Sequence, residues 1–327
     1  MDTERETVLI TGVTGFIGSH VVNEVLKNDG FQVVAPVRNA KAYKNVEVLQ
    51  RQGVALIEGN FFDPRLIEAI FDRYPVNNII HIAALRGIGI GSAQECMEVN
   101  LRGTERLLEG ALSHGVKKFI FCSSVGVLGT IPTELPGGVH SRVNGDNAYH
   151  KSKILAEEKV CSFIDKGLNA FIVRPAITYG EGDMGFPAVL VKLIRKRALL
   201  LSSKNIQVHL LSVSKLAEIF LKILTCESLK EKTFIAADKS PIGLRELTNL
   251  VYAYYHGKPY PRIMTIPQAV CSAMLLSFRL LGNEKWYARM QLLSQDWYYS
   301  VDEIQSALHI SLANTKEDFP KFLSGVN

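Results

Sequence analysis

The sequence predicts an α/β protein with a doubly wound parallel sheet, followed by a smaller and mainly helical region. First, a short apolar run leads directly into a glycine-rich turn and then into a segment with helical spacing. Second, apolar β-rich runs alternate with helical patterns, as expected when helices cover both faces of a parallel sheet. Third, helical patterns dominate from Leu244 onward.

Seven runs carry the strand pattern: Val8–Ile10, Gln32–Val37, Ala55–Glu58, Asn78–Ile82, Phe119–Ser123, Ala170–Val173 and Thr233–Ala236. Helix signals separate them. Asp63 and Pro64 supply an N-cap and a first-turn proline, and a helix over Ala93–His114 is expected to close at Gly115.

The domain organisation follows from this pattern. We expect a dinucleotide-binding domain over residues 1–180, with a returning segment near 206–238. A substrate-binding region then comprises 181–205 and 239–327. Within it, the apolar segment Ile266–Leu281 is too short to span a membrane, so we expect a packing helix that covers a substrate cavity, with a surface-bound membrane helix as the alternative.

Composition excludes several classes of protein. The chain is 47% hydrophobic and 21% charged, which is typical of a globular protein. Its net charge is only +5, and the basic tract at 195–197 has no interleaved aromatic residues, so no nucleic-acid partner is expected. Five scattered cysteines form no metal-binding spacing, and the first residues lack the layout of a signal peptide. We therefore expect a cytoplasmic protein that has reduced thiols, no bound metal and no membrane partner.

The glycine-rich turn is the first functional motif. In TGVTGFIG, Gly12 permits a tight turn, Gly15 lets the backbone approach a pyrophosphate, and Gly18 lets the following helix pack closely. The positive end of that helix can hold the anion. Because the motif lies between a strand and a helix, we expect a Rossmann-type dinucleotide site.

Six segments in chain order resemble the extended short-chain dehydrogenase/reductase family. They are TGVTGFIG, IIHIAA at 79–84, VNLRGTERLL at 99–108, FIFCSS at 119–124, YHKSK at 149–153 and RPAITYG at 174–180. The resemblance covers roughly the first 180 residues. It implies an NAD(P)-dependent enzyme similar to the NAD-dependent epimerases and dehydratases, and within them it most resembles the ketoreductase and hydroxysteroid dehydrogenase branch.

Tyr149 and Lys153 are the central pair of the expected catalytic site. Their spacing of four residues places them on one face of a helix, where the ammonium is expected to lower the tyrosine pKa from about 10. Tyr149 can then act as general acid or base. By resemblance, Lys153 also holds the nicotinamide ribose, and Ser124 holds the substrate oxygen, with Ser123 as the fallback.

The resemblance also assigns the cofactor contacts. Asn100 is expected to steady the site through backbone contacts, Asn60 to lie near adenine, and Pro175 and Ile177 to lie along the nicotinamide. The full expected set is Gly12, Thr14, Gly15, Phe16, Ile17, Arg38, Asn60, Phe61, Ala83, Ala84, Asn100, Tyr149, Lys153, Pro175 and Ile177.

Arg38 favours NADP(H) over NAD(H), which stays the alternative. No Asp or Glu occurs between Gly30 and Val46, where an acid would bind the adenosine ribose hydroxyls. Arg38 instead offers a forked donor suited to a 2′-phosphate.

Three functions remain open. The preferred one is interconversion of a carbonyl and a secondary alcohol on a small, apolar molecule, because RPAITYGEGD has Ile177 and Glu181 where sugar epimerases typically have asparagine and proline. A nucleotide-sugar epimerase is the alternative. A non-catalytic NAD(P) sensor or scaffold is the third, although retention of Ser124, Tyr149 and Lys153 disfavours it. The family further suggests a homodimer through helices at 93–114 and 147–166.

Overall fold

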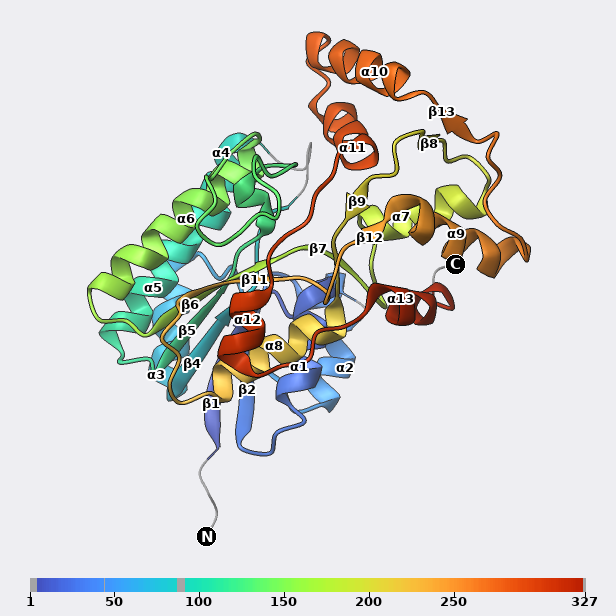
Figure 1. Ribbon diagram of the computed structural model, residues 1–327. Helices are drawn as coiled ribbons and strands as arrows, with labels where there is room; N and C mark the ends of the chain where they lie inside the picture. The colour runs from blue at the N-terminus through green and yellow to red at the C-terminus, as the bar shows by residue number, and fades with distance from the viewer. Residues whose placement is uncertain (1–4, 44, 87–91, 326–327) are drawn as a thin grey trace. The chain divides into compact units, whose positions relative to one another are not determined.

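The computed structural model describes residues 5–43, 45–86 and 92–325, and the chain divides into two compact units (Figure 1). The first unit comprises Met1–Ser124, Asn147–Arg174 and Leu216–Phe234. The second comprises Val125–Asp146, Pro175–Lys215 and Ile235–Asn327.

The first unit contains a seven-stranded sheet in the order β11-β6-β5-β4-β1-β2-β3. All seven predicted strands are confirmed, with bounds β1 Glu6–Thr11, β2 Phe31–Val37, β3 Ala55–Glu58, β4 Val76–His81, β5 Lys118–Cys122, β6 Ala170–Pro175 and β11 Thr233–Ala236. Strands β1 to β6 pair in parallel. The strand order reverses between β1 and β4, and open α/β sheets bind ligands at such a switch point.

The pairing register determines which loops meet at this point. Thr11 is paired with His81, and His81 with Phe121, so the carboxyl ends of β1, β4 and β5 lie level with one another. The loops that follow these strands therefore emerge at one edge of the sheet.

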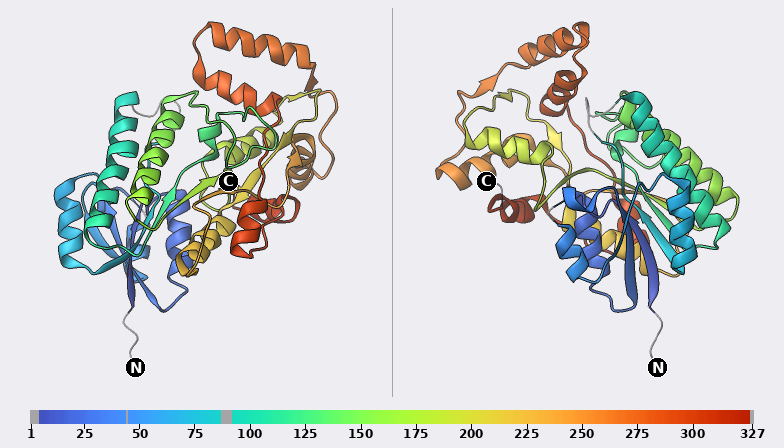
Figure 2. Two further views of the ribbon diagram at one scale, coloured as in Figure 1. Left: turned by 60° about the vertical axis from the view of Figure 1, so that its left-hand side comes forward. Right: turned by 180° about the vertical axis from the view of Figure 1, so that it is seen from behind.

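Helices cover both faces of this sheet (Figures 1 and 2). One face carries α1 Phe16–Val25, α2 Val46–Arg51 and α8 Val213–Thr225, and the other carries α3 Pro64–Arg73, α5 Gly103–Ser113 and α6 Ala148–Asp165. The start of α3 is confirmed, because the Asp63 carboxylate accepts a hydrogen bond from Arg65 N at 3.0 Å.

The predicted helix over Ala93–His114 is interrupted. It consists of α4 Ala93–Cys96, a π-helical turn η2 at Met97–Arg102, and α5. Its end is confirmed: Gly115 has φ +66°, and Val116 N donates to Ala111 O at 2.9 Å, which closes the helix as a glycine C-cap.

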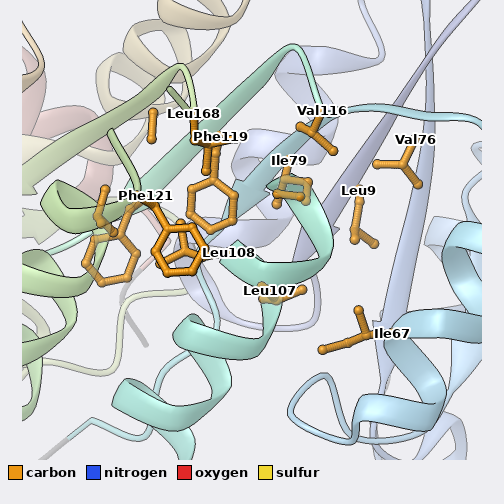
Figure 3. Close-up of a cluster of buried hydrophobic side chains, with 14 of the residues drawn as sticks. Leu9, Ile67, Val76, Ile79, Leu107, Leu108, Val116, Phe119, Phe121 and Leu168 are labelled. Atoms are coloured by element: carbon orange, nitrogen blue, oxygen red, sulfur yellow. The ribbon is translucent and has the colours of Figure 1, made fainter. Parts of the chain in front are cut away.

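The core of the first unit lies between the sheet and α3, α5 and α6. Figure 3 shows Phe119 and Phe121 of β5 packed near Leu107 and Leu108 of α5, with Leu9 and Ile79 on the neighbouring strands. These side chains are buried, so the strand ends that they support are held rigidly.

The second unit contains short strand pairs and helices. β7 Ile177–Tyr179 pairs with β10 Leu210–Ser212, β9 Gln207–Val208 with β12 Ile242–Gly243, and β8 Leu201–Ser202 with β13 Thr265–Ile266. The other elements are η1 Ala40–Ala42 in the first unit, and in the second η3 Val125–Leu128, α7 Phe186–Arg195, α9 Leu244–His256, α10 Gln268–Leu280, α11 Glu284–Ser294, α12 Asp302–Leu308 and α13 Thr315–Leu323. The mainly helical character predicted from Leu244 onward is confirmed.

The expected helix at Ile266–Leu281 is present as α10, which packs against α11 as a hairpin. Within α10 only Cys271 is buried, and Leu276 and Leu280 are exposed to solvent. Its expected role in covering a substrate cavity stays a prediction. Within the described ranges no helix is long and apolar enough to cross a membrane.

Candidate active site

The glycine-rich turn between β1 and α1 is closely packed. Gly12 has φ +80°, and a Cβ there would lie 2.8 Å from Ala83 N. A Cβ on Gly18 would lie 2.1 Å from Gly12 O. Both positions therefore require glycine, because a side chain would push the turn away from the loop after β4 or from α1.

The amino terminus of α1 is suited to an anion. Its N-cap is Gly15, it has no side-chain cap, and its first turn contains no acidic residue. Unlike Gly12, Gly15 has an ordinary φ of −85°, although a Cβ there would meet Gly12 O at 3.2 Å. The half-buried Phe16 and Ile17 begin this helix. The turn thus suits the pyrophosphate of a dinucleotide, because no side chain caps the start of α1 and the glycines let an anion approach the backbone.

His81 is a buried structural residue. Its Nδ1 lies 2.7 Å from Thr11 Oγ1 and its Nε2 lies 3.0 Å from Thr104 Oγ1. Burial, aided by the charge of Lys153, holds the pKa of His81 well below its ordinary value, so the ring is neutral. Thr11 Oγ1 also accepts from Ile82 N and Ala83 N, which ties the loop containing Ala83 and Ala84 to β1.

Helix α6 positions the expected catalytic pair. Asn147 caps it by accepting from His150 N at 2.9 Å, which places Tyr149 in the first turn. One turn later, Lys153 is buried; its Nζ donates to Cys122 O at 2.8 Å and lies 4.5 Å from the centre of the Phe121 ring. Burial lowers the pKa of Lys153 to about 8.

Tyr149 forms a side-chain hydrogen bond with Ser124, which follows β5 and ends the first of the three segments of the first unit. The expectation that Lys153 lowers the tyrosine pKa is wrong for the chain by itself. Burial raises the pKa of Tyr149 to about 12, and the groups that oppose this rise are Arg86 and Ser124. The reason is that Lys153 points its ammonium at Cys122 O, while the loss of hydration penalises the phenolate.

The adjacent serines have different partners. Ser123 is buried and its Oγ donates to Glu157 Oε1, whereas Ser124 is half-buried and pairs with Tyr149. Arg174 completes the buried group with a fork-like contact to Glu157, Nη2 to Oε2 at 2.7 Å and Nε to Oε1 at 3.0 Å. Ser123 is thereby engaged in structure, and Ser124 is the serine that faces the tyrosine.

Asn100 joins the loop after β4 to α6. Its Oδ1 accepts from Leu85 N at 2.7 Å, and its Nδ2 donates to Leu85 O and to Ser152 Oγ, each at 2.9 Å. It lies in the π-helical turn η2, a local widening that often occurs at functional sites.

The remaining expected contacts are placed as follows. Arg38 is exposed at the end of β2 and donates to Tyr43 OH at 3.2 Å. Asn60 is exposed after β3, while the Phe61 ring is buried against His81 and Gly103. Phe61 can therefore offer a ligand only its backbone. Thr14 lies in the first unit, whereas Pro175 and Ile177 lie in the second.

Two groups at this site were missed by the sequence reasoning. Arg86, which follows the IIHIAA segment, acts electrostatically on both Tyr149 and Cys122. The Glu157–Arg174 pair stands behind Ser123. Glu157 lies four residues after Lys153 and so on the same helix face, which was the only available signal.

Comparison with known proteins identifies the family. A model of the NAD dependent epimerase/dehydratase family matches residues 8–235. Human (Homo sapiens) UDP-glucose 4-epimerase is 33% identical over 197 residues, which cover 55% of this chain and 56% of that enzyme. The chain thus spans about half the length of the curated relatives that it matches.

Solved structures agree on the fold. A Thermotoga maritima UDP-glucose 4-epimerase with UDP-glucose superposes with TM-score 0.78 at 20% identity, covering 98% of each chain. The Bordetella bronchiseptica enzyme WbmG in complex with NAD and UDP gives TM-score 0.75 at 19% identity, covering 98% of this chain and 92% of that one. The resemblance identified from the sequence motifs is confirmed at the level of the family, and the Rossmann-type fold is confirmed.

Proposed function

Because the chain belongs to the NAD dependent epimerase/dehydratase family, we propose that it catalyses hydride transfer between an NAD(P) cofactor and a substrate that alternates between carbonyl and secondary alcohol. One observation carries the proposal: Ser124, Tyr149 and Lys153 converge at the carboxyl end of β5, within one unit. This edge also carries the glycine turn after β1.

The chain's own residues provide the proton chemistry. The nicotinamide, when bound, donates or accepts the hydride. Ser124 orients the substrate oxygen, and Tyr149 gives it a proton during reduction or removes one during oxidation. Since burial raises the pKa of Tyr149 to about 12, the chain alone favours the protonated, acid form of this residue. In the direction of oxidation, Arg86 and the Ser124 hydroxyl are the groups of the chain that favour the phenolate of Tyr149.

Gly12, Gly15 and the start of α1 would hold the pyrophosphate, and Arg38 would decide between the two cofactors. We propose a preference for NADP(H), because the exposed Arg38 at the end of β2 has only Tyr43 OH as a described hydrogen-bond partner and can turn its fork to a 2′-phosphate. The structural relatives in complex with NAD make NAD(H) the alternative.

Titration of both cofactors against wild type and Arg38→Ala tests this preference. We expect Arg38→Ala to lose about tenfold in NADPH affinity with NADH affinity unchanged, as for loss of one charge-assisted pair. Arg51→Ala, an exposed arginine on α2, is the control. Equal affinity of the wild type for both cofactors would contradict the preference.

The substrate has two candidates. We favour a small, apolar carbonyl compound, on the strength of Ile177 and Glu181 in the segment after β6. Nucleotide-sugar epimerisation is the second candidate, and it is favoured by the named activities of the relatives.

A substrate panel decides between them. Purified protein is given apolar ketones with NADPH or NADH, and separately UDP-sugars with either oxidised cofactor, with Lys153→Met as the background. Ketone-dependent oxidation of the reduced cofactor supports the first candidate. Conversion of a UDP-sugar to its epimer, without ketone turnover, would replace it by the second, and no reaction in either arm would leave a cofactor-binding sensor.

Dimerisation is a further part of this proposal. Leu112 on α5 and Leu155 on α6 are both partly exposed, on the two helices that we expected to form the dimer contact. Sedimentation equilibrium should show a dimer for wild type and a weakened one for Leu155→Gln; a monomeric wild type would contradict it.

A further inference from the structure

The α10–α11 hairpin and the segment just before it have an unusual concentration of exposed apolar side chains. Of the fifteen large hydrophobic residues found exposed in the described chain, six fall within residues 263–286. We call these six the hairpin surface: Ile263, Val270, Leu276, Leu280, Leu281 and Trp286. Three of them are exposed by more than three quarters: Ile263 at 91%, Leu280 at 79% and Leu281 at 78%. Exposure on this scale indicates an interaction site.

The exposed positions of α10 form a continuous stripe. Ala269, Ala273, Leu276 and Leu280 follow one another at helical spacings of four, three and four residues, so they lie on one face, and all are exposed. Cys271 lies off this stripe and is the buried residue of the helix. Leu281, the C-cap residue next to Leu280, is also exposed where the hairpin turns.

The charge around this stripe is mainly positive, and Glu284 at the start of α11 is the one acid close to it in sequence. No Asp or Glu occurs between Glu246 and Glu284, whereas this stretch contains Lys258, Arg262 and Arg279. Two more basic residues, Lys285 and Arg289, follow on α11. An apolar stripe bordered by cations is complementary to a bilayer with anionic headgroups.

Trp286, in the first turn of α11, packs on the side of α10 away from the stripe and is an aromatic residue of the kind found at membrane interfaces. It is 48% exposed, its ring stacks on Phe278 at 6.1 Å between centroids, and the Arg289 guanidinium lies 5.2 Å from its centre. Indole rings suit the headgroup level because one end is apolar and the N–H is polar.

We propose that the hairpin surface docks this protein on anionic lipid bilayers. With thirteen residues, α10 is far too short to span a bilayer, so it lies flat in the interface. This replaces our expectation that the chain has no membrane partner. A second copy of the chain is a poorer occupant, because both halves of a two-fold contact would carry the same excess of cations, including Arg279 and Lys285.

Intrinsic fluorescence offers a direct test, since the chain has two tryptophans and they differ in exposure. Trp297 is 0% exposed and Trp286 is half-exposed, so a spectral change on adding vesicles reports on Trp286. With vesicles of phosphatidylcholine and phosphatidylserine we expect a blue shift, and quenching by brominated acyl chains. The shift should disappear in Trp286→Phe and shrink in high salt or with phosphatidylcholine alone.

Vesicle flotation tests the stripe itself. The double variant Leu280→Gln/Leu281→Gln should need about tenfold more lipid for half-binding, since two exposed leucines lose their burial. Val48→Gln on α2, where Val48 is 50% exposed, is the matched control and should bind as wild type. Both leucines are exposed, so the variants are expected to fold, which circular dichroism checks.

Three outcomes would overturn the proposal. They are absence of wild-type protein from the floated vesicle fraction, equal binding of the double variant, and binding that does not depend on phosphatidylserine. Loss of a lipid-free oligomer in the double variant, without vesicle binding by wild type, would assign the surface to a second copy of the chain.

Discussion

The two units bury a carboxylate in different ways. In the first, Glu157 is paired with Arg174 and accepts from Ser123. In the second, Asp238 is fully buried and held by neutral donors: Ser212 N at 2.9 Å, Tyr179 OH at 2.9 Å and Thr315 Oγ1 at 2.7 Å. No cation pairs with Asp238 in the part of the chain that the structure describes.

The difference shows what each unit requires of its buried acid. Burial raises the pKa of Asp238, while its three hydrogen-bond donors act to lower it. Glu157 lies beside the expected catalytic residues, and Arg174 keeps its charge compensated there. We infer that the acid of the first unit supports the site and that the acid of the second unit ties β7 and β10 to α13.

The largest expected effect comes from removing the cation of the first unit. Arg174→Met should lower the free energy of unfolding by about 3–5 kcal/mol, because it leaves Glu157 buried without a partner. Chemical denaturation measures this value. Arg51→Met breaks an exposed pair with Glu47 and should cost less than about 0.5 kcal/mol.

A second substitution sharpens this test. Adding Glu157→Gln to Arg174→Met removes the uncompensated charge and should restore part of the stability. If the double variant is no more stable than Arg174→Met, charge compensation is not what the pair provides.

Acid should weaken the second unit through His209. This buried ring lies between Asp238 O and Tyr299 N, and burial lowers the pKa of His209 to about 4. In the unfolded chain this histidine binds a proton near pH 6.5, whereas in the folded chain it does so only near pH 4. The stability is therefore complete above pH 6.5 and falls by about 3 kcal/mol as the pH decreases to 4.

Unfolding curves from pH 7 to 4.5 check this. His209→Gln, which keeps a donor and an acceptor, should flatten the dependence, and His140→Gln, at an exposed position, should not. The residual slope is expected from His81 in the first unit, whose pKa is also lowered. An unchanged slope in His209→Gln would show that this ring does not stay neutral.

Tyr149→Phe tests the site without touching either carboxylate. Turnover should fall about a hundredfold or more, because the substrate oxygen loses its proton donor. Cofactor affinity and the melting temperature should change little. Tyr254→Phe, at an exposed tyrosine of α9, is the control, and unchanged turnover in Tyr149→Phe would remove this residue from the mechanism.

The smallest expected effects come from removing one hydroxyl group that donates a hydrogen bond to each buried acid. Thr315→Val should destabilise by about 1 kcal/mol, because it removes one of the three donors to Asp238. Ser123→Ala should cost less, since Glu157 keeps Arg174. Denaturation of both variants measures the difference, and a larger loss in Ser123→Ala would contradict the contrast drawn between the two acids.

The sequence by itself determined the seven strands, the glycine turn and the spacing of Tyr149 and Lys153. Each is a local property. Strand runs are short and apolar, and residues four apart on a helix share a face. Gly12 has φ +80°, a backbone conformation that favours glycine. The same local reasoning found the Asp63 cap and the Gly115 helix end.

Only the tertiary structure decided how these residues are surrounded. It turned Lys153 towards Cys122 O, raised the tyrosine pKa by burial, and gave Ser123 and Ser124 different partners. It also left the leucines of α10 in solvent, although their pattern resembled that of a packing helix. Burial and pairing depend on groups brought from distant parts of the chain, and an apolar stripe in a sequence does not say what covers it.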